Sequence, residues 1–450
     1  MKSKTLNMTE GNPLYLLVVF AIPMLIGNIF QQTYNLVDSV IVGKYVGANA
    51  LAAIGVTNSI SFLFFALCNG IGSGGGIITA RQFGAGDKET VKKAIVNSGY
   101  ILIMGSLVVG TIAFLLAESL LLLMNTPKDI LPDALLYMRL QCVGLPLIAI
   151  YNHVSAMLRA IGDSKTPLYF LLFACVLNIG LDMWFVCRLE MGIFGAAIAT
   201  IIAQLVAGVG CLAYACKYNE YFKWERWHFK VEPKLIWGAV RLGIPLSLQF
   251  SLVAFSCMAL QRVVNSFGAV VVAAFTASGR VEQLLHQPYG TFSAALSTYS
   301  GQNLGAGNVK RIKKGYHKSL ILMGIFSLIM LPIMQLFGDE IVSLFVDEEE
   351  VICYGATALR ITSWFYLPLG LINVVRGVLN GVGDSLFALI NGTVEVVIRI
   401  ILPVVLVTIP FIGVWGIWWS TGISWVISAL VCLWRYAYWK KDIKEQVRAV

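Results

Sequence analysis

The sequence predicts an all-α membrane protein of about twelve transmembrane helices, arranged as two homologous six-helix lobes. Three observations predict this fold class: the composition, a series of long apolar runs and an internal repeat. Of the 450 residues, 58% are hydrophobic and only 13% are charged. Soluble domains average roughly 45–50% apolar and about 25% charged residues. A soluble fold could not bury so much apolar surface, so we expect the lipid bilayer to be the solvent.

Twelve apolar runs are separated by charged or Gly/Pro-rich breaks, and each offers the roughly 20 residues that a spanning helix requires. The runs are continuously apolar, whereas the strands of a membrane β-barrel alternate apolar and polar residues over about ten positions. We expect the spans at residues 13–42, 51–80, 95–117, 131–158, 167–188, 193–216, 236–261, 270–298, 316–337, 351–379, 386–410 and 413–437.

The basic residues predict how these spans are oriented. Of the 33 Lys and Arg residues, 25 fall on the side of the N-terminus, Arg376 among them, 6 on the opposite side and 2 within spans. Because basic loops remain in the cytoplasm, we expect a multi-pass protein of the plasma (inner) membrane with both termini in the cytoplasm. Short basic segments between apolar runs serve orientation, so nucleic acid is not an expected partner.

The chain repeats itself at a nearly constant interval. Ile22-Pro23 recurs 222 residues later as Ile244-Pro245, and Gly84-Ala85-Gly86 recurs after 221 residues as Gly305-Ala306-Gly307. Six spans return the chain to its starting side, so the halves are parallel repeats about a pseudo-two-fold axis along the membrane normal, as in many secondary transporters. We expect an N-terminal lobe at 1–216, a cytoplasmic linker at 217–235, a C-terminal lobe at 236–437 and a cytoplasmic tail at 438–450.

Few ionisable residues lie inside the spans. A charge at the centre of a spanning helix costs roughly 2.5–3.5 kcal/mol on insertion, so each of these residues is a candidate for a functional or pairing role. Asp38, Asp182 and Thr200 lie at similar depths in the first, fifth and sixth spans, and Asn178 shares the helix face of Asp182. Such oxygen atoms suit a hard cation, and neighbouring carboxylates repel until a proton or cation lies between them. The alternative is that the two aspartates are hydrated near the membrane interface.

The second half lacks this acidic pair, because the repeat places Leu260 and Pro403 at the corresponding positions. It carries Arg280 and Glu282 in the eighth span and Glu395 and Arg399 in the eleventh. The last two are four residues apart, which predicts an ion pair within one helix. The spacing leaves open whether Glu282, Glu395 and Arg399 form a site in the second lobe.

Two further features of the spans have both a structural and a functional interpretation. Pro23 interrupts the helix that carries Asp38, and is either a static kink or a bending point. The run Gly70–Gly76 lacks the lysine and the preceding strand of a phosphate-binding loop, so we expect it to allow close helix packing. The nine cysteines and four histidines show no disulfide or metal-ligand spacing. We therefore expect neither an enzyme nor a cofactor, and no metal beyond a bound Na⁺.

The motifs of these spans resemble the MATE family, the multidrug and toxic compound extrusion transporters. The similar features are Pro23 followed by Gln31-x-x-Tyr34-x-x-x-Asp38, the loop Gly84-Ala85-Gly86-Asp87, the segment from Leu158 to Pro167, and Asn178-Ile179-Gly180-Leu181-Asp182. The resemblance covers essentially the whole chain. It implies a V-shaped pair of lobes in a monomeric secondary antiporter, which exports organic, often cationic, compounds in exchange for H⁺ or Na⁺ by alternating access.

The resemblance also assigns roles to residues. It implies a first-lobe cation site at Asp38, Asn178, Asp182 and Thr200, with Gln31, Tyr34 and Asn152 in the adjoining polar network and Pro23 as a hinge. Some branches of the family use acidic residues of spans 7 and 10, but here those spans offer Gln249, Gln261 and Asn373. An alternative function is a related flippase for lipid-linked oligosaccharides, although its cavity should be far more basic.

Overall fold

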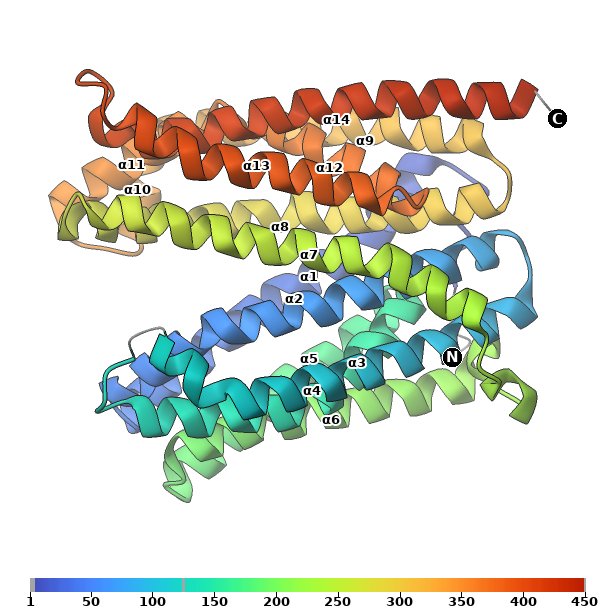
Figure 1. Ribbon diagram of the computed structural model, residues 1–450, viewed down its shortest axis with the longest axis horizontal. Coiled ribbons are helices and arrows are strands. Elements are labelled where there is room, and N and C mark those ends of the chain that lie inside the picture. The colour runs from blue at the N-terminus through green and yellow to red at the C-terminus, as the bar shows by residue number, and fades with distance from the viewer. Residues whose placement is uncertain (1–4, 124–125, 449–450) are drawn as a thin grey trace. The chain divides into compact units, whose positions relative to one another are not determined.

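A computed structural model describes residues 5–123 and 126–448, with the side chains of 58–65, 67–68, 254, 258 and 442–448 excepted. Long helices make up most of this described chain, which contains no strand (Figure 1). The long helical segments are α1 (Pro13–Tyr45), α2 (Ala48–Gly84), α3 (Lys88–Leu123), α4 (Leu131–Ala160), α5 (Lys165–Asp182) with η1 (Met183–Arg188), α6 (Gly192–Tyr218), α7 (Pro233–Asn265), α8 (Ala269–Gly305), α9 (Val309–Leu336), α11 (Glu349–Ser363) with α12 (Tyr366–Gly381), α13 (Ser385–Leu406) and α14 (Gly416–Arg448). The short ones are η2 (Glu220–Phe222), η3 (Arg226–Phe229), α10 (Gly338–Ser343) and η4 (Gly413–Trp415).

Each predicted span coincides with one of these long segments, which confirms the all-helical, multi-span fold class. Among the described residues, nine helices are long and apolar enough to cross a membrane, and the pair α11 and α12 makes a tenth. This pair, which corresponds to the predicted span at 351–379, bends by 55°. α8 does not meet the same apolar criterion, because its middle carries Arg280, Glu282 and His286.

The chain divides into two compact units. The first comprises Met1–Glu10, Val19–Leu248 and Gly305–Gly307, and the second comprises Gly11–Val18, Gln249–Leu304 and Asn308–Val450. The chain therefore passes from one unit to the other within α1, between Val18 and Val19, and again within α7, between Leu248 and Gln249. The lobe and linker boundaries expected from the repeat stay predictions.

Small residues bring the helices of the first unit close together. α4 packs against α2, α3 and α6 (Figure 1). The glycine run of α2 lies on the first half of α7, where a Cβ atom added to Gly74 would approach the backbone nitrogen of Gly243 to 2.6 Å. Such a distance leaves no room for any side chain, so the run serves helix packing, as the sequence predicts.

Two aspartates of the loop motifs hold the starts of helices. Asp87 accepts hydrogen bonds from the backbone N–H of Thr90 at 3.0 Å and from its hydroxyl at 2.6 Å, and these donors lower the pKa of Asp87. Asp163 accepts the equivalent pair from Thr166 at 3.0 and 2.7 Å. These contacts satisfy backbone donors at the first turns of α3 and α5, so both motifs have a structural role.

The segment between α6 and α7, expected as a linker, is folded against α3. The His228 side chain is fully buried, its Nε2 lies 2.8 Å from Glu89 Oε2, and its ring stacks on Trp227 at a centroid distance of 3.8 Å. Lys93 forms an ion pair of 2.6 Å with Glu232, whose backbone N–H donates to Asn97. The segment is therefore part of the first unit and positions the start of α7.

Replacing His228 with Ala should lower the melting temperature of the purified protein by a few degrees, because it removes a buried hydrogen-bonded ring from this contact. Thermal unfolding in detergent measures the change. Arg226→Ala, an exposed position in the same short helix, is the control and should leave the melting temperature unchanged. Equal melting temperatures of His228→Ala and the wild type would show that the contact with α3 contributes nothing.

Candidate functional site

Buried acceptor oxygens gather in the first unit where α1, α5 and α6 supply polar side chains. Asp182 is 0% exposed and Asn178 is 2% exposed, whereas Asp38 is partly buried. Both carboxylate oxygens of Asp182, Oδ1 of Asp38 and Oδ1 of Asn178 are buried atoms that no donor of the described chain reaches. Buried polar atoms are nearly always hydrogen-bonded, so four such acceptors in one region need an explanation.

The local structure of α5 and α6 sets the orientation of these groups. Asp182 is the last residue of α5, and the wider π-helical turn η1 begins at the next residue. The Asn178 side-chain N–H donates to Thr200 Oγ1 at 3.4 Å, and the Thr200 hydroxyl donates to the Ala196 carbonyl at 3.2 Å. One N–H of Asn178 and the hydroxyl of Thr200 are thus used between and within the helices, and the oxygen of the Asn178 amide has no donor in the described chain.

The carboxyl groups of Asp38 and Asp182 lie within hydrogen-bonding reach of each other. Two acceptors cannot bond directly, and two carboxylates at this distance repel in a medium of low dielectric constant. A proton shared between them, or a hard cation coordinated by the oxygens, would satisfy all of these atoms. Within the described residues, no three His, Cys, Asp or Glu side chains gather as a metal site. The arrangement therefore fits a proton or an oxygen-liganded cation.

Of the three residues expected in the polar network beside the aspartates, one lies close to them in the structure. Tyr34 is buried and hydrogen-bonded to Gln204 of α6, close to both aspartates. Gln31 is exposed and Asn152 is half-buried, and the described chain shows no hydrogen bond from either to the aspartates. The structure thus brings Tyr34 to the candidate site, while the roles of Gln31 and Asn152 stay predictions.

Sequence reasoning missed two neighbours of the aspartates. Gln204 lies four residues after Thr200, so the same-face rule that linked Asn178 with Asp182 could have found it. Tyr137 of α4 is 7% exposed and close enough to interact electrostatically with Asp38 and Asp182. Tyr137 lies one turn after Asp133 of α4, and no spacing within α4 indicated its proximity to Asp38 and Asp182.

The second unit contains a buried cluster of opposite composition, in which each charge meets a counter-charge. Arg376 donates to Glu395 at 2.9 Å and to Asn391 at 2.7 Å. Glu395 also pairs with Arg399 at 3.2 Å, which confirms the predicted pair within α13. Arg376, counted among the inner residues, lies five residues before the end of α12, where its side chain is 13% exposed and contacts α13.

α8 adds Glu282 and His286 to this cluster. Glu282 lies near Thr362 and interacts with the charge of Arg399, and its buried Oε1 has no hydrogen-bond partner in the described chain. The His286 ring meets the edge of Trp425 at a centroid distance of 5.6 Å, and the Arg399 guanidinium lies 5.9 Å from the same indole. Glu282, Glu395 and Arg399 thus lie in one cluster, whose two carboxylates balance two guanidinium groups.

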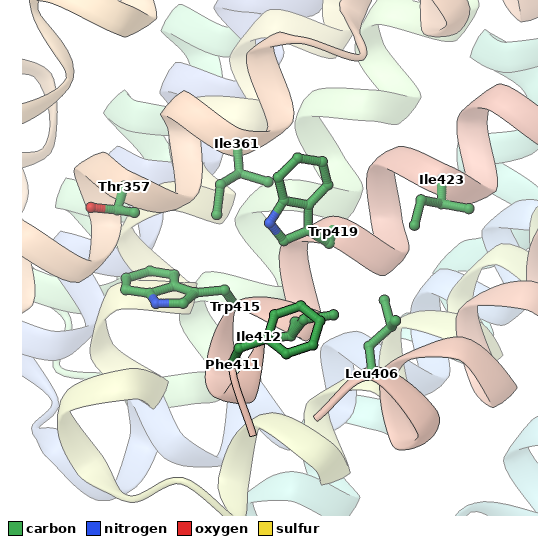
Figure 2. A pocket seen from close by; sticks show the side chains of 8 residues that line it. All are labelled: Thr357, Ile361, Leu406, Phe411, Ile412, Trp415, Trp419 and Ile423. Atoms are coloured by element: carbon green, nitrogen blue, oxygen red, sulfur yellow. The ribbon is translucent and has the colours of Figure 1, made fainter. Parts of the chain in front are cut away.

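A pocket of about 470 Å³ in the second unit is apolar and aromatic (Figure 2). Its lining side chains are Thr357, Ile361, Leu406, Phe411, Ile412, Trp415, Trp419 and Ile423. It lies where α13 ends and α14 begins, and aromatic residues at the ends of spanning helices are typical of the membrane interface. Its lining contains no ionisable group, so the candidate cation site remains with the aspartates of the first unit.

Comparisons with known proteins agree on one family. The family model MatE matches the chain twice, at residues 23–184 and 245–405. The chain is 32% identical over 448 residues to the probable multidrug resistance protein YpnP of Bacillus subtilis, covering 97% of this chain and 98% of that protein.

Solved structures agree with the family match. A crystal structure of MATE in complex with MaL6 has a TM-score of 0.91 at 26% identity, covering 97% of this chain and 99% of that one. The outward-facing conformation of a multidrug resistance MATE family transporter of the MOP superfamily has a TM-score of 0.90 at 25% identity, covering 96% and 97%.

Glu395→Ala should lower the free energy of unfolding by about 3–5 kcal/mol, because it leaves two buried guanidinium groups without their counter-charge. Thermal unfolding of the purified protein measures the loss. The matched control is Glu118→Ala, whose exposed pair with Arg139 is 4.0 Å long and should contribute less than about 1 kcal/mol. Similar losses for both variants would contradict the structural importance of the buried cluster.

Proposed function

We propose that this chain, which belongs to the MATE family of membrane transporters, is a secondary active antiporter that exports small organic compounds in exchange for H⁺ or Na⁺. The observation that supports the exchange is the group of unpartnered buried oxygens of Asp38, Asp182 and Asn178. Two neighbouring carboxylates among them favour the uptake of a positive ion, which removes their repulsion. Binding and release of that ion can therefore be coupled to a change of conformation.

The coupling step begins with ion uptake at the aspartates. A proton or Na⁺ between Asp38 and Asp182 removes their repulsion and draws α1 toward α5. Since α1 also contains Pro23, which leaves the Val19 carbonyl without its helical N–H partner, the helix can bend at this point. The chain passes between the two compact units at Val18 and Val19, so a bend there would convert ion binding into alternating access.

The orientation of the transporter follows from its charges. The basic residues on the side of the N-terminus support cytoplasmic termini in the plasma (inner) membrane. With this orientation Asp38 and Asp182 lie nearer the outer surface, so an inward ion gradient loads the site from outside. One chain contains all the candidate residues, which is consistent with a monomer. The cationic character of the substrate, expected from the resemblance, stays a prediction.

Asp38→Asn and Asp182→Asn should each lower gradient-driven efflux about tenfold or more, because a charge-assisted contact to the ion is worth ~1.5–3 kcal/mol. Efflux of ethidium and of carboxyfluorescein in everted vesicles, under separate pH and sodium gradients, measures the loss and identifies the ion. Asp129→Asn, an exposed acid outside the site, is the control. Wild-type efflux in both site variants would remove the aspartates from the mechanism.

Pro23→Ala should slow efflux while leaving ion binding intact, because it restores the helical hydrogen bond to the Val19 carbonyl and stiffens α1. Ion binding is measured separately, as the rise in melting temperature with Na⁺ concentration or with falling pH. Pro332→Ala, a change at a proline within α9, is the control for loss of any helix kink. Full transport by Pro23→Ala would argue against a hinge at this residue.

A further inference from the structure

α8 presents a stripe of polar side chains on its exposed face. Thr276, Arg280 and Gln283 are exposed and Gln287 is half-buried, at successive spacings of four, three and four residues. Such spacing places all four on one side of a helix. The opposite side of α8 carries Glu282 and His286 toward the buried cluster, so the helix is polar on two faces.

The depth of the stripe excludes a lipid environment. Arg280 is eleven residues from the start of α8 at Ala269, which corresponds to about 16 Å along the helix. The hydrocarbon core is about 30 Å thick, and Arg280 lies ten residues inside the predicted span 270–298, so the stripe runs through the membrane, with Gln283 and Gln287 further along. A charged group at that depth faces water or a partner and not acyl chains. We therefore place the stripe on an aqueous path.

Arg280 differs from Arg376 and Arg399, which are balanced by Glu395 and by the nearby Glu282. Throughout residues 5–123 and 126–448, no carboxylate lies within ion-pair distance of Arg280. An anion beside Arg280 would supply the counter-charge that Arg376 and Arg399 already have.

The stripe offers hydrogen-bond donors on an exposed surface. They are the five N–H groups of Arg280 and the amide groups of Gln283 and Gln287, three and seven residues further along α8. The Thr276 hydroxyl already donates to the Val272 carbonyl at 2.8 Å, so it offers only an acceptor.

We infer that Arg280, Gln283 and Gln287 bind the anionic group of an exported organic anion, such as the carboxylate, sulfonate or phosphate of a small amphiphilic solute. The planar guanidinium accepts such groups in bidentate geometry, and the two amides extend the contact along α8. An organic cation without an acidic group would be repelled at this position. The inference rests on the proposed export function and narrows its substrate class.

The test measures binding without transport. Carboxyfluorescein is titrated against the purified protein in phosphatidylcholine nanodiscs, and its fluorescence anisotropy reports the affinity. We expect saturable binding by the wild type, about tenfold weaker binding by Arg280→Gln and an intermediate affinity for Arg280→Lys. Gln283→Leu should weaken binding less. Arg262→Gln, an exposed arginine at the end of α7, is the control and should match the wild type.

Equal affinities of the wild type and Arg280→Gln, or saturable binding of ethidium but not of carboxyfluorescein, would overturn the inference. Nanodiscs that contain phosphatidylglycerol test the lipid alternative: loss of carboxyfluorescein binding in them would assign the stripe to a lipid headgroup and overturn the solute assignment. Efflux of neither dye in vesicles, with Arg280-dependent binding retained, would overturn the export function alone and leave the anion site standing.

Discussion

A charge or bare polar atom inside the bilayer requires a partner, because burying it alone costs several kcal/mol. The two units meet this constraint in opposite ways. Glu395 in the second unit uses both oxygens on arginines, whereas neither oxygen of the fully buried Asp182 in the first has a donor. Glu395 is thus satisfied by side chains of its own unit, whereas Asp182 requires a donor or a positive ion from outside the described chain. This difference is the basis for proposing the ion site in the unit that holds the aspartates.

The two halves of the chain repeat the same helices, but the second half has no counterpart of the Asp38 and Asp182 pair. The family model matches once in each half, and its two matches begin 222 residues apart at residues 23 and 245. At the position that corresponds to Asp38 the second half has Leu260, which is 6% exposed within an apolar core cluster. Pro403, buried in α13, corresponds to Asp182. Within the described residues, the paired aspartates thus belong to one half of the duplicated scaffold, and the ion site proposed for them has no counterpart at the equivalent positions of the other half.

Features that depend on neighbouring residues could be predicted from the sequence, and those that depend on distant contacts could not. The spans follow from the length of apolar runs, and the Glu395–Arg399 pair follows from a four-residue spacing. The 55° bend between α11 and α12 lies about one turn before Pro368 and has a local cause. The folding of His228 onto α3 and the contacts of Arg376 with α13 arise between remote segments.

The composition of α8 decides where this helix can lie. A helix with ions on one face is amphipathic and can cover a protein core while its other face meets lipid. α8 is polar on both faces, with Glu282 and His286 on one and Arg280 and Gln283 on the other, so neither can meet acyl chains. Glu282 and His286 face the buried cluster, whereas Arg280 and Gln283 require water or a polar solute as their partner. A helix too polar to pass as a membrane span by hydropathy is thus the one expected to line the path that a solute takes.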